Sequence, residues 1–120
     1  MILIIGGAYQ GKLDYAKKTF GIADGDVYVC GKEEIDFSRR CICEIQEFTF
    51  ANADPAKVFE ENKDKWKDSI LICRDIFCGV VPMGAENRLW RQKTGRLCQY
   101  LAGEADQVIR IFCGLEQRLK

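Results

Sequence analysis

The chain has 120 residues, with 18 Lys and Arg against 18 Asp and Glu, and it contains no histidine. This length predicts a single domain over residues 1–120, built around one core. The zero net charge argues against a nucleic-acid-binding protein, which normally carries a basic excess. The lack of histidine excludes nucleophiles of the Ser-His and Cys-His type. No apolar run approaches the roughly 20 residues of a membrane span, so we expect no membrane span and a cytoplasmic location.

The cysteine pattern also points to a reducing compartment. Their number is odd, no C-x-x-C occurs, and most of them lie in apolar runs, where a thiol behaves as a small hydrophobic group. We therefore expect free thiols rather than disulfides. The seven positions are Cys30, Cys41, Cys43, Cys73, Cys78, Cys98 and Cys113.

The first 30 residues predict a βαβ unit. Residues 2–5 read ILII, a continuous apolar run typical of a parallel strand covered on both faces. A glycine-rich turn follows, then a helix is predicted over residues 11–20, ended by Gly21. The run VYVC at residues 27–30 predicts the second strand. This order of strand, glycine loop, helix and strand is the context that a phosphate-binding loop requires.

The middle of the chain is less clearly patterned. Residues 40–50 alternate around their cysteines and predict a strand, although the start of a helix fits as well. Asp54 before Pro55 signals a helix over residues 55–66, because proline is tolerated in the first helical turn. The run SILIC at residues 69–73 predicts another buried strand.

The last third completes the alternation of strands and helices. Residues 77–84 form a loop punctuated by glycine and proline, and residues 85–103 show the longest helical periodicity. A final strand is predicted over residues 107–113. The sequence therefore predicts an α/β domain with a mainly parallel sheet of about four or five strands.

The loop after the first strand resembles a nucleotide-binding P-loop. The motif G-x-x-x-x-G-K followed by Ser or Thr is matched by Gly6, Gly11 and Lys12, but Leu13 stands where the hydroxyl belongs. Backbone N–H groups and a helix N-terminus suit phosphate, and the lysine adds a positive charge. A plain tight turn with a solvated lysine is the alternative. The predicted cradle for ATP or GTP consists of Gly6, Gly7, Ala8, Tyr9, Gln10, Gly11, Lys12 and Leu13.

Two acidic residues are candidates for binding Mg²⁺. Asp75 follows the SILIC strand and Glu44 lies within CICE, and a carboxylate at the end of a central strand commonly holds the metal or its water. Asp75 is also the candidate catalytic group beside Lys12. The alternatives are a loop cap or a partner of Arg74 for Asp75, and a solvent-facing position for Glu44.

Two segments carry a resemblance to a known family. MILIIGGAYQGK at the N-terminal end and CGVVPMGAENRLWRQKTGRLCQYLAGEADQVIRIFCGLEQRLK at the C-terminal end resemble the adenosylcobinamide kinase / adenosylcobinamide-phosphate guanylyltransferase family of cobalamin biosynthesis. The resemblance implies a P-loop fold of the RecA-like kind, in three α/β/α layers. It also implies phosphorylation of cobinamide, a corrinoid, by ATP or GTP, transfer of GMP onto the product, and a homo-oligomer, with a trimer as the candidate.

The resemblance also assigns residues. Gly6, Gly7, Gly11 and Lys12 look like the family's nucleotide-phosphate cradle. The substrate-side loop and the helix after it correspond to Val81, Pro82, Glu86, Arg88 and Arg91. The arginines on this helix fit the solvated face of an amphipathic helix as well as a phosphate contact.

Three departures from the family leave two functions open. The chain lacks the histidine that accepts GMP in the family, Leu13 replaces the P-loop serine, and Arg74-Asp75 replaces Asn-Glu. The first hypothesis is a phosphotransferase of the cobinamide-kinase type. The second is a catalytically silent nucleotide- or corrinoid-binding protein that regulates or scaffolds.

Overall fold

The computed structural model describes residues 1–77 and 84–120. In this part of the chain, six strands form one sheet in the order β2-β3-β4-β1-β5-β6. Neighbouring strands are parallel except β5 and β6, which form an antiparallel hairpin at one edge. The strands are β1 (Ile2–Gly6), β2 (Val27–Val29), β3 (Cys41–Cys43), β4 (Ile70–Arg74), β5 (Gln107–Phe112) and β6 (Leu115–Arg118).

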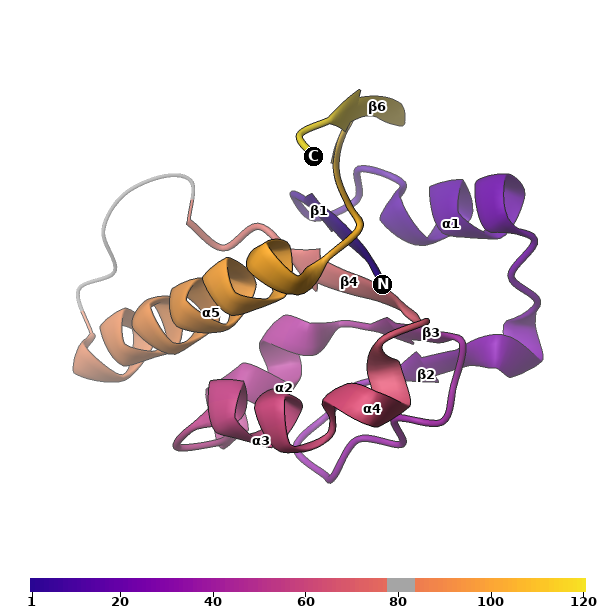
Figure 1. Cartoon of the computed structure of the whole chain (residues 1–120). Coiled ribbons are helices and arrows are strands. Elements are labelled where there is room, and N and C mark those ends of the chain that lie inside the picture. The colour runs from indigo at the N-terminus through magenta and orange to yellow at the C-terminus, as the bar shows by residue number, and fades with distance from the viewer. Residues whose placement is uncertain (78–83) are drawn as a thin grey trace.

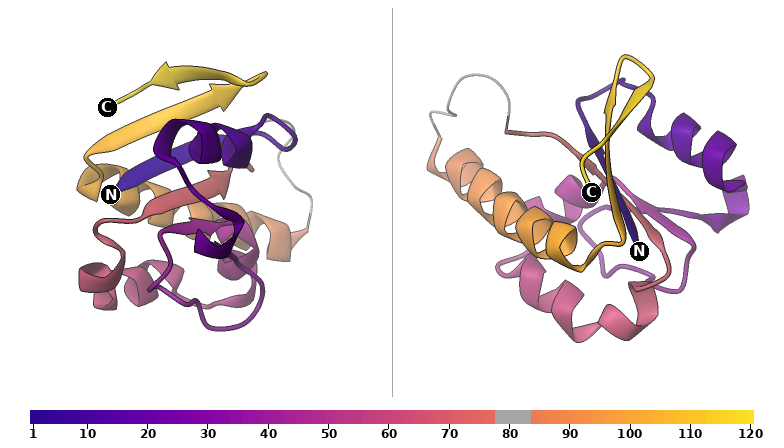
Figure 2. Two further views of the ribbon diagram at one scale, coloured as in Figure 1. Left: turned by 90° about the vertical axis from the view of Figure 1, so that its right-hand side faces the viewer. Right: turned by 45° about the horizontal axis from the view of Figure 1, so that its top comes forward.

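Helices cover both faces of the sheet, as Figures 1 and 2 show. One face carries α1 (Lys12–Phe20). The other carries α2 (Ile45–Ala51), α3 (Pro55–Glu61), α4 (Lys63–Trp66) and α5 (Ala85–Glu104), and a short 3₁₀ turn, Asp24–Asp26, precedes β2. The α/β/α layering and the P-loop, RecA-like fold class predicted from the sequence are confirmed.

The two faces arise from the two-residue period of the strands. In β4, Ile70 and Ile72 pack with Ala16 of α1, whereas Leu71 and Cys73 pack with the helices of the opposite face. Because both sides of β1 and β4 are covered, these strands are apolar throughout rather than alternating with polar residues. The central position of β1 places the end of this strand, and the loop after it, in the middle of one edge of the sheet.

Three details differ from the sequence prediction. The sheet has six strands in the described part rather than four or five, because residues 115–118 form β6; all four are exposed, so they carry no burial pattern. Residues 40–50 contain a strand and a helix, separated only by Glu44. The helix expected over residues 55–66 is divided at Asn62, which ends α3 and precedes α4.

The described cysteines are free thiols, and Cys78 lies outside the described residues. Burial raises the pKa of Cys30 and Cys41 to about 12 and that of Cys43 to about 11. These thiols therefore remain protonated at neutral pH. Within residues 1–77 and 84–120, no helix is both long and apolar enough to cross a membrane.

Candidate functional site

The glycine loop joins the central strand to the first helix. β1 ends at Gly6 and α1 begins at Lys12, with Gly11 as the N-cap in the left-handed conformation at φ 88°. No side chain caps this helix start. The N–H groups of its first turn lack partners within the helix and, together with the helix dipole, favour an anion.

Neighbouring strands hold the loop closely. A Cβ atom at Gly6 would lie 2.6 Å from the carbonyl oxygen of Ile111 on β5, so only glycine fits there without a shift of the backbone. The N–H of Gly114, in the β5–β6 turn, donates to the carbonyl of Gln10 over 2.9 Å. The C-terminal hairpin therefore supports the loop from one side.

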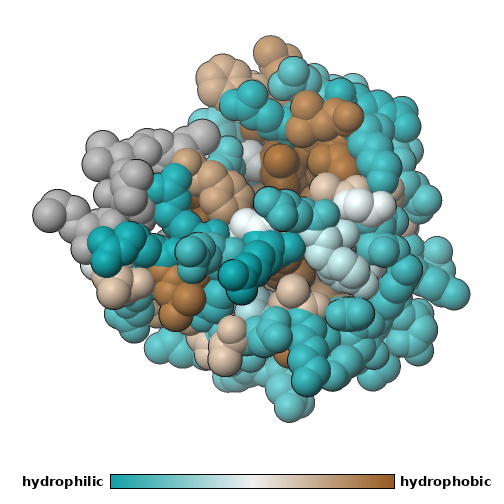
Figure 3. Space-filling view, turned by 60° about the vertical axis from the view of Figure 1, so that its left-hand side comes forward, coloured by the Kyte–Doolittle hydropathy of each residue, from teal (hydrophilic) through white to brown (hydrophobic). Residues whose placement is uncertain are grey.

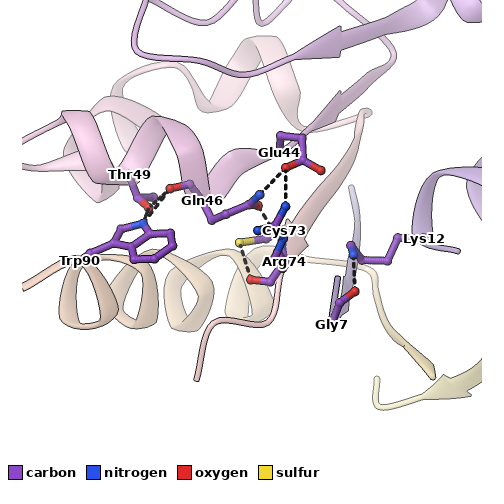
Figure 4. A network of polar contacts seen from close by, with 8 residues as sticks. All are labelled: Gly7, Lys12, Glu44, Gln46, Thr49, Cys73, Arg74 and Trp90. Carbon is purple, nitrogen blue, oxygen red and sulfur yellow. Dashed lines mark hydrogen bonds and ion pairs between the residues drawn. The ribbon is translucent and has the colours of Figure 1, made fainter. Parts of the chain in front are cut away.

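The side chain of Lys12 folds back over the loop, as Figure 4 shows. Its Nζ donates to the carbonyl oxygen of Gly7 over 2.7 Å, and the residue is only 9% exposed. Burial lowers the pKa of Lys12; the charge of Glu44 opposes this effect and that of Arg74 adds to it. The lysine, the acid and the arginine thus act on one another electrostatically.

A pocket of about 190 Å³ lies between the loop and the ends of two strands. The loop and helix side is formed by residues 9–14, and the strand side by Cys43, Glu44 and Ile72. Lys12 supplies a positive charge to this pocket and Glu44 a negative one. The predicted P-loop lysine and one of the two predicted metal carboxylates are therefore in the same pocket.

Leu13 lines this pocket and is also packed against the core. It is half-buried and packs against the apolar cluster between α1 and the sheet, which includes Ile4, Ala16 and Ile72. The position of the missing hydroxyl is thus occupied by an apolar side chain that also stabilises the helix start.

Glu44 owes its position to an unusual backbone conformation. It is the N-cap of α2 and has φ 57°, in the left-handed region that non-glycine residues rarely adopt. Such strain is concentrated at functional sites. The Oε2 atom of Glu44 accepts a hydrogen bond from Nε2 of Gln46 and lies 3.4 Å from Nη2 of Arg74.

Sequence reasoning missed Gln46 and Arg74. Gln46 is fully buried, and its Oε1 accepts a hydrogen bond from the backbone N–H of Arg74 over 2.9 Å. It therefore connects β4 to the carboxylate of Glu44, as Figure 4 shows. A buried glutamine leaves no signal in a helical pattern, whereas a charged residue at the end of an apolar strand beside β1 could have marked Arg74.

Asp75 has a different environment from Glu44. Its backbone N–H donates to the carbonyl of Gly6 over 2.7 Å, and its Oδ1 accepts a hydrogen bond from the N–H of Phe77 over 2.9 Å. It is not among the residues that line the pocket with Lys12. The structure thus places Glu44, and not Asp75, among the residues that line the pocket with Lys12.

The side chains around Lys12 offer few oxygen ligands for Mg²⁺. Leu13 offers no oxygen, and the Oε2 atom of Glu44 already contacts Gln46 and Arg74. Throughout residues 1–77 and 84–120, no group of three His, Cys, Asp or Glu side chains is placed to hold a metal ion. Mg²⁺ bound through nucleotide phosphates uses one or two carboxylates. Two carboxylates line this pocket: Glu44, which is paired with a guanidinium, and Asp14, which is exposed on the first turn of α1.

The substrate-side residues lie at the start of α5. Glu86 and Arg88 are exposed, Arg91 is half-buried, and Nη2 of Arg91 donates to the carbonyl oxygen of Phe77. Val81 and Pro82 lie outside the described residues. The described residues thus place only the helical part of this predicted site. Of its described residues, Glu86, Arg88 and Arg91, none lines the pocket with Lys12.

A larger hollow lies on the opposite face of the sheet from α1. It has a volume of about 520 Å³ and is lined mainly by apolar side chains of β1, β5 and α5, among them Ile5, Val108 and Cys98. Figure 3 shows apolar side chains gathered in a depression on the side of the molecule where α5 lies. Lys12, Glu44 and Arg74 do not line it, so this hollow is separate from the pocket around Lys12.

Comparison with known proteins gives one family. The model described as cobinamide kinase / cobinamide phosphate guanyltransferase matches residues 37–119. This range includes Glu44, Gln46, Arg74 and the whole of α5, but not the glycine loop at residues 6–12. No curated protein matches the chain. The matched range is more than half of the sequence, and the chain therefore belongs to the cobinamide kinase / cobinamide phosphate guanyltransferase family.

Proposed function

We propose that residues 1–120 form one nucleotide-binding domain that holds the phosphates of ATP or GTP in the pocket around Lys12. The observation that carries this proposal is the convergence of Lys12 and the N-terminus of α1 on one pocket at the end of the central strand. Nζ now donates to Gly7, and a phosphate oxygen can replace that carbonyl as a stronger, charged acceptor.

Family membership supports a role in cobalamin biosynthesis, with cobinamide as the corrinoid ligand. In an active enzyme the reaction is phosphoryl transfer from the nucleotide to a hydroxyl of cobinamide. Lys12 would stabilise the charge on the transferred phosphoryl group. The exposed start of α5, with Glu86, Arg88 and Arg91, remains the predicted substrate side, while the cytoplasmic location and the homo-oligomer, with a trimer as candidate, remain predictions.

The second function is a catalytically silent nucleotide- or corrinoid-binding protein that regulates or scaffolds. It is favoured by Leu13, which removes the hydroxyl ligand of the metal, and by Glu44, which is paired with Arg74. Asp75, the predicted catalytic carboxylate, does not line the pocket. In this proposal the site keeps the groups that bind phosphate and lacks those that drive its transfer.

Calorimetric titration with non-hydrolysable ATP and GTP analogues tests the binding site. Lys12→Ala should weaken binding about tenfold or more, because it deletes a charge-assisted hydrogen bond of about 1.5 kcal/mol upward. Lys18→Ala is the matched control, since Lys18 is an exposed lysine of the same helix. Equal affinity of Lys12→Ala and the wild type would exclude the proposed pocket.

A turnover assay separates the two functions once binding is established. Phosphorylation of cobinamide by ATP or GTP, followed by mass spectrometry of the corrinoid, should be observed for an active kinase and should be lost in Lys12→Ala. Nucleotide binding without any phosphorylated corrinoid would assign the silent function.

A further inference from the structure

A guanidinium lies beside the pocket around Lys12, because Arg74 is paired with Glu44, which lines that pocket. β4 lies directly beside β1, and Arg74 is the register partner of Gly6, the first glycine of the loop. The side chain of Arg74 points to Glu44, with its Nη2 atom 3.4 Å from Oε2. Both side chains are 37% exposed, so the pair borders the pocket and remains accessible to a ligand.

Arg74 is held in this place by a buried group. Gln46 accepts a hydrogen bond from the backbone of Arg74 and donates one to the carboxylate of Glu44. The same fully buried side chain thus fixes both partners of the ion pair. A guanidinium attached to a central strand and aligned in this way is preorganised for a ligand.

We infer that Arg74 takes the place of a divalent cation in this pocket: it binds the nucleotide phosphates and neutralises Glu44, so that nucleotide binds without Mg²⁺. This inference rests on the proposed function, because it requires that phosphates occupy the pocket around Lys12. The inference adds two points to the proposed function. Arg74 supplies the second positive charge, and the pocket accepts the nucleotide without a bound Mg²⁺.

The charges and donors of the pocket agree with this role. Glu44 alone would repel a triphosphate, and its charge would cancel that of Lys12. With Arg74 beside it, the charges of Lys12 and Arg74 balance those of Glu44 and of Asp14, which also lines the pocket; without Arg74 the acidic side chains would be in excess by one. A guanidinium has five N–H donors in a planar array that matches phosphate, and the contact with Glu44 uses one of them.

The effect of Arg74 on Lys12 supports their proximity. The positive charge of Arg74 contributes to lowering the pKa of the lysine, so the two groups lie within range of electrostatic interaction. A phosphate placed between them would be attracted by both cations. Mg²⁺ would compete with Arg74 for the same carboxylate instead of adding a new contact.

The test is nucleotide affinity measured by calorimetry in EDTA and in a series of Mg²⁺ concentrations. The probes are non-hydrolysable ATP and GTP analogues, and the proteins are wild type, Arg74→Ala, Glu44→Gln and Arg40→Ala. Arg40→Ala is the matched control, because Arg40 also pairs with an acid, Asp26. Arg40 precedes the first residue of β3 and so lies at the other end of the strands from Arg74, which ends β4. Thermal unfolding of each variant checks that it folds.

We expect the wild type to bind in EDTA with an affinity within about threefold of that in Mg²⁺. Arg74→Ala should bind about tenfold or more weakly in EDTA, because charge-assisted hydrogen bonds are lost, whereas Arg40→Ala should bind as the wild type does. Glu44→Gln keeps the shape of the side chain but removes the charge that repels phosphate, so this variant should bind in EDTA more tightly than the wild type does. This last variant tests the inference even if Arg74→Ala does not fold.

Three results would overturn the inference while leaving the proposed function intact. They are a wild type that binds only with Mg²⁺, an Arg74→Ala variant with unchanged affinity in EDTA, and a Glu44→Gln variant that loses a Mg²⁺ response present in the wild type. If the wild type binds neither nucleotide in either condition, the proposed function itself fails, and the role of Arg74 fails with it.

Discussion

Gly6 and Gly7 are consecutive in the glycine loop, yet their surroundings differ. A Cβ atom at Gly6 would meet the Ile111 carbonyl oxygen at 2.6 Å, whereas one at Gly7 would meet only the side chain of Gln10 at 3.5 Å. Gly6→Ala should therefore lower the free energy of unfolding by about 1–3 kcal/mol, as overpacking against a fixed backbone does. Gly7→Ala should stay within about 0.5 kcal/mol of the wild type. Urea denaturation measures both, and equal stabilities would contradict the close packing of β1 against β5.

Lys12 should give nucleotide binding an unusual pH dependence. Because its pKa is lowered from 10.5, mainly by burial, the folded protein loses this proton at a lower pH than the unfolded chain does. Folding is therefore disfavoured by the charged lysine at low pH, and this cost is relieved as pH rises through the lowered pKa. Nucleotide affinity should fall over that same range, below pH 10.5, because the charge that holds phosphate is lost.

Variants of Glu44 and Arg74 should change the pH at which nucleotide affinity is lost. Glu44 raises the pKa of Lys12, so Glu44→Gln should move the loss of affinity to lower pH. Arg74 lowers that pKa, so in Arg74→Lys, which retains a positive charge, the loss should stay close to that of the wild type. Calorimetry at several pH values, with circular dichroism to confirm folding, makes the measurement. If affinity is lost at the same pH in Glu44→Gln as in the wild type, the charge of Glu44 does not act on Lys12.

At the scale of elements, a buried polar contact joins α2 to α5. Thr49 and Thr94 are fully buried with their hydroxyl oxygens 2.6 Å apart, and Thr49 also donates to the carbonyl of Gln46. Nε1 of Trp90 lies 2.7 Å from the same carbonyl, as Figure 4 shows. Thr49→Val should lower the free energy of unfolding by about 1–3 kcal/mol, because it leaves the Thr94 hydroxyl without this buried partner.

A double-mutant cycle distinguishes this contact from two independent sites. Replacing both threonines by valine removes both polar groups and keeps the volume, so the double variant should cost less than the sum of the two single variants. Chemical denaturation of the four proteins provides the comparison. Additive costs would show that the two hydroxyl groups do not stabilise the helix pair jointly.

Boundaries between elements were harder to predict than the elements themselves. The apolar runs predicted β1, β4 and β5, since a fully covered strand is apolar along its whole length. β6 escaped prediction because four exposed residues show no period; its place depends on the turn at Cys113 and Gly114, both in the left-handed conformation. The boundary between β3 and α2 was not predicted either, because only one residue, Glu44, separates the strand from the helix.

At the scale of the whole molecule, topology decides which predicted site residues meet. The sequence predicted the loop with Lys12, and the central place of β1 makes it part of a pocket with the residue after β3, Glu44. The sequence prediction selected Asp75 and missed Arg74, although consecutive residues of a strand point to opposite faces. Arg74 lies two residues after Ile72 and therefore on the same face of the sheet, and Ile72 lines the pocket. Asp75 is one residue further along the chain, so it is out of step with this face.

The composition of the chain also limits its covalent chemistry. The family description includes guanyl transfer, and a covalent route for this needs a nucleophile that attacks the α-phosphorus of GTP. The chain has no histidine, and burial raises the pKa of Cys43, the thiol that lines the pocket, to about 11. At neutral pH this thiol is almost entirely protonated and therefore a poor nucleophile.

We therefore expect no GMP adduct after incubation of the protein with GTP, with or without Mg²⁺. The intact mass of the protein, measured by electrospray mass spectrometry without acid exposure, should remain that of the unmodified chain. Lys12→Ala and Cys43→Ser serve as controls, because they remove the amine and the thiol that line the pocket. An added GMP in the wild type would contradict the expectation, and its loss in Cys43→Ser would identify that thiol as the nucleophile. Loss in Lys12→Ala alone would follow equally from weaker nucleotide binding.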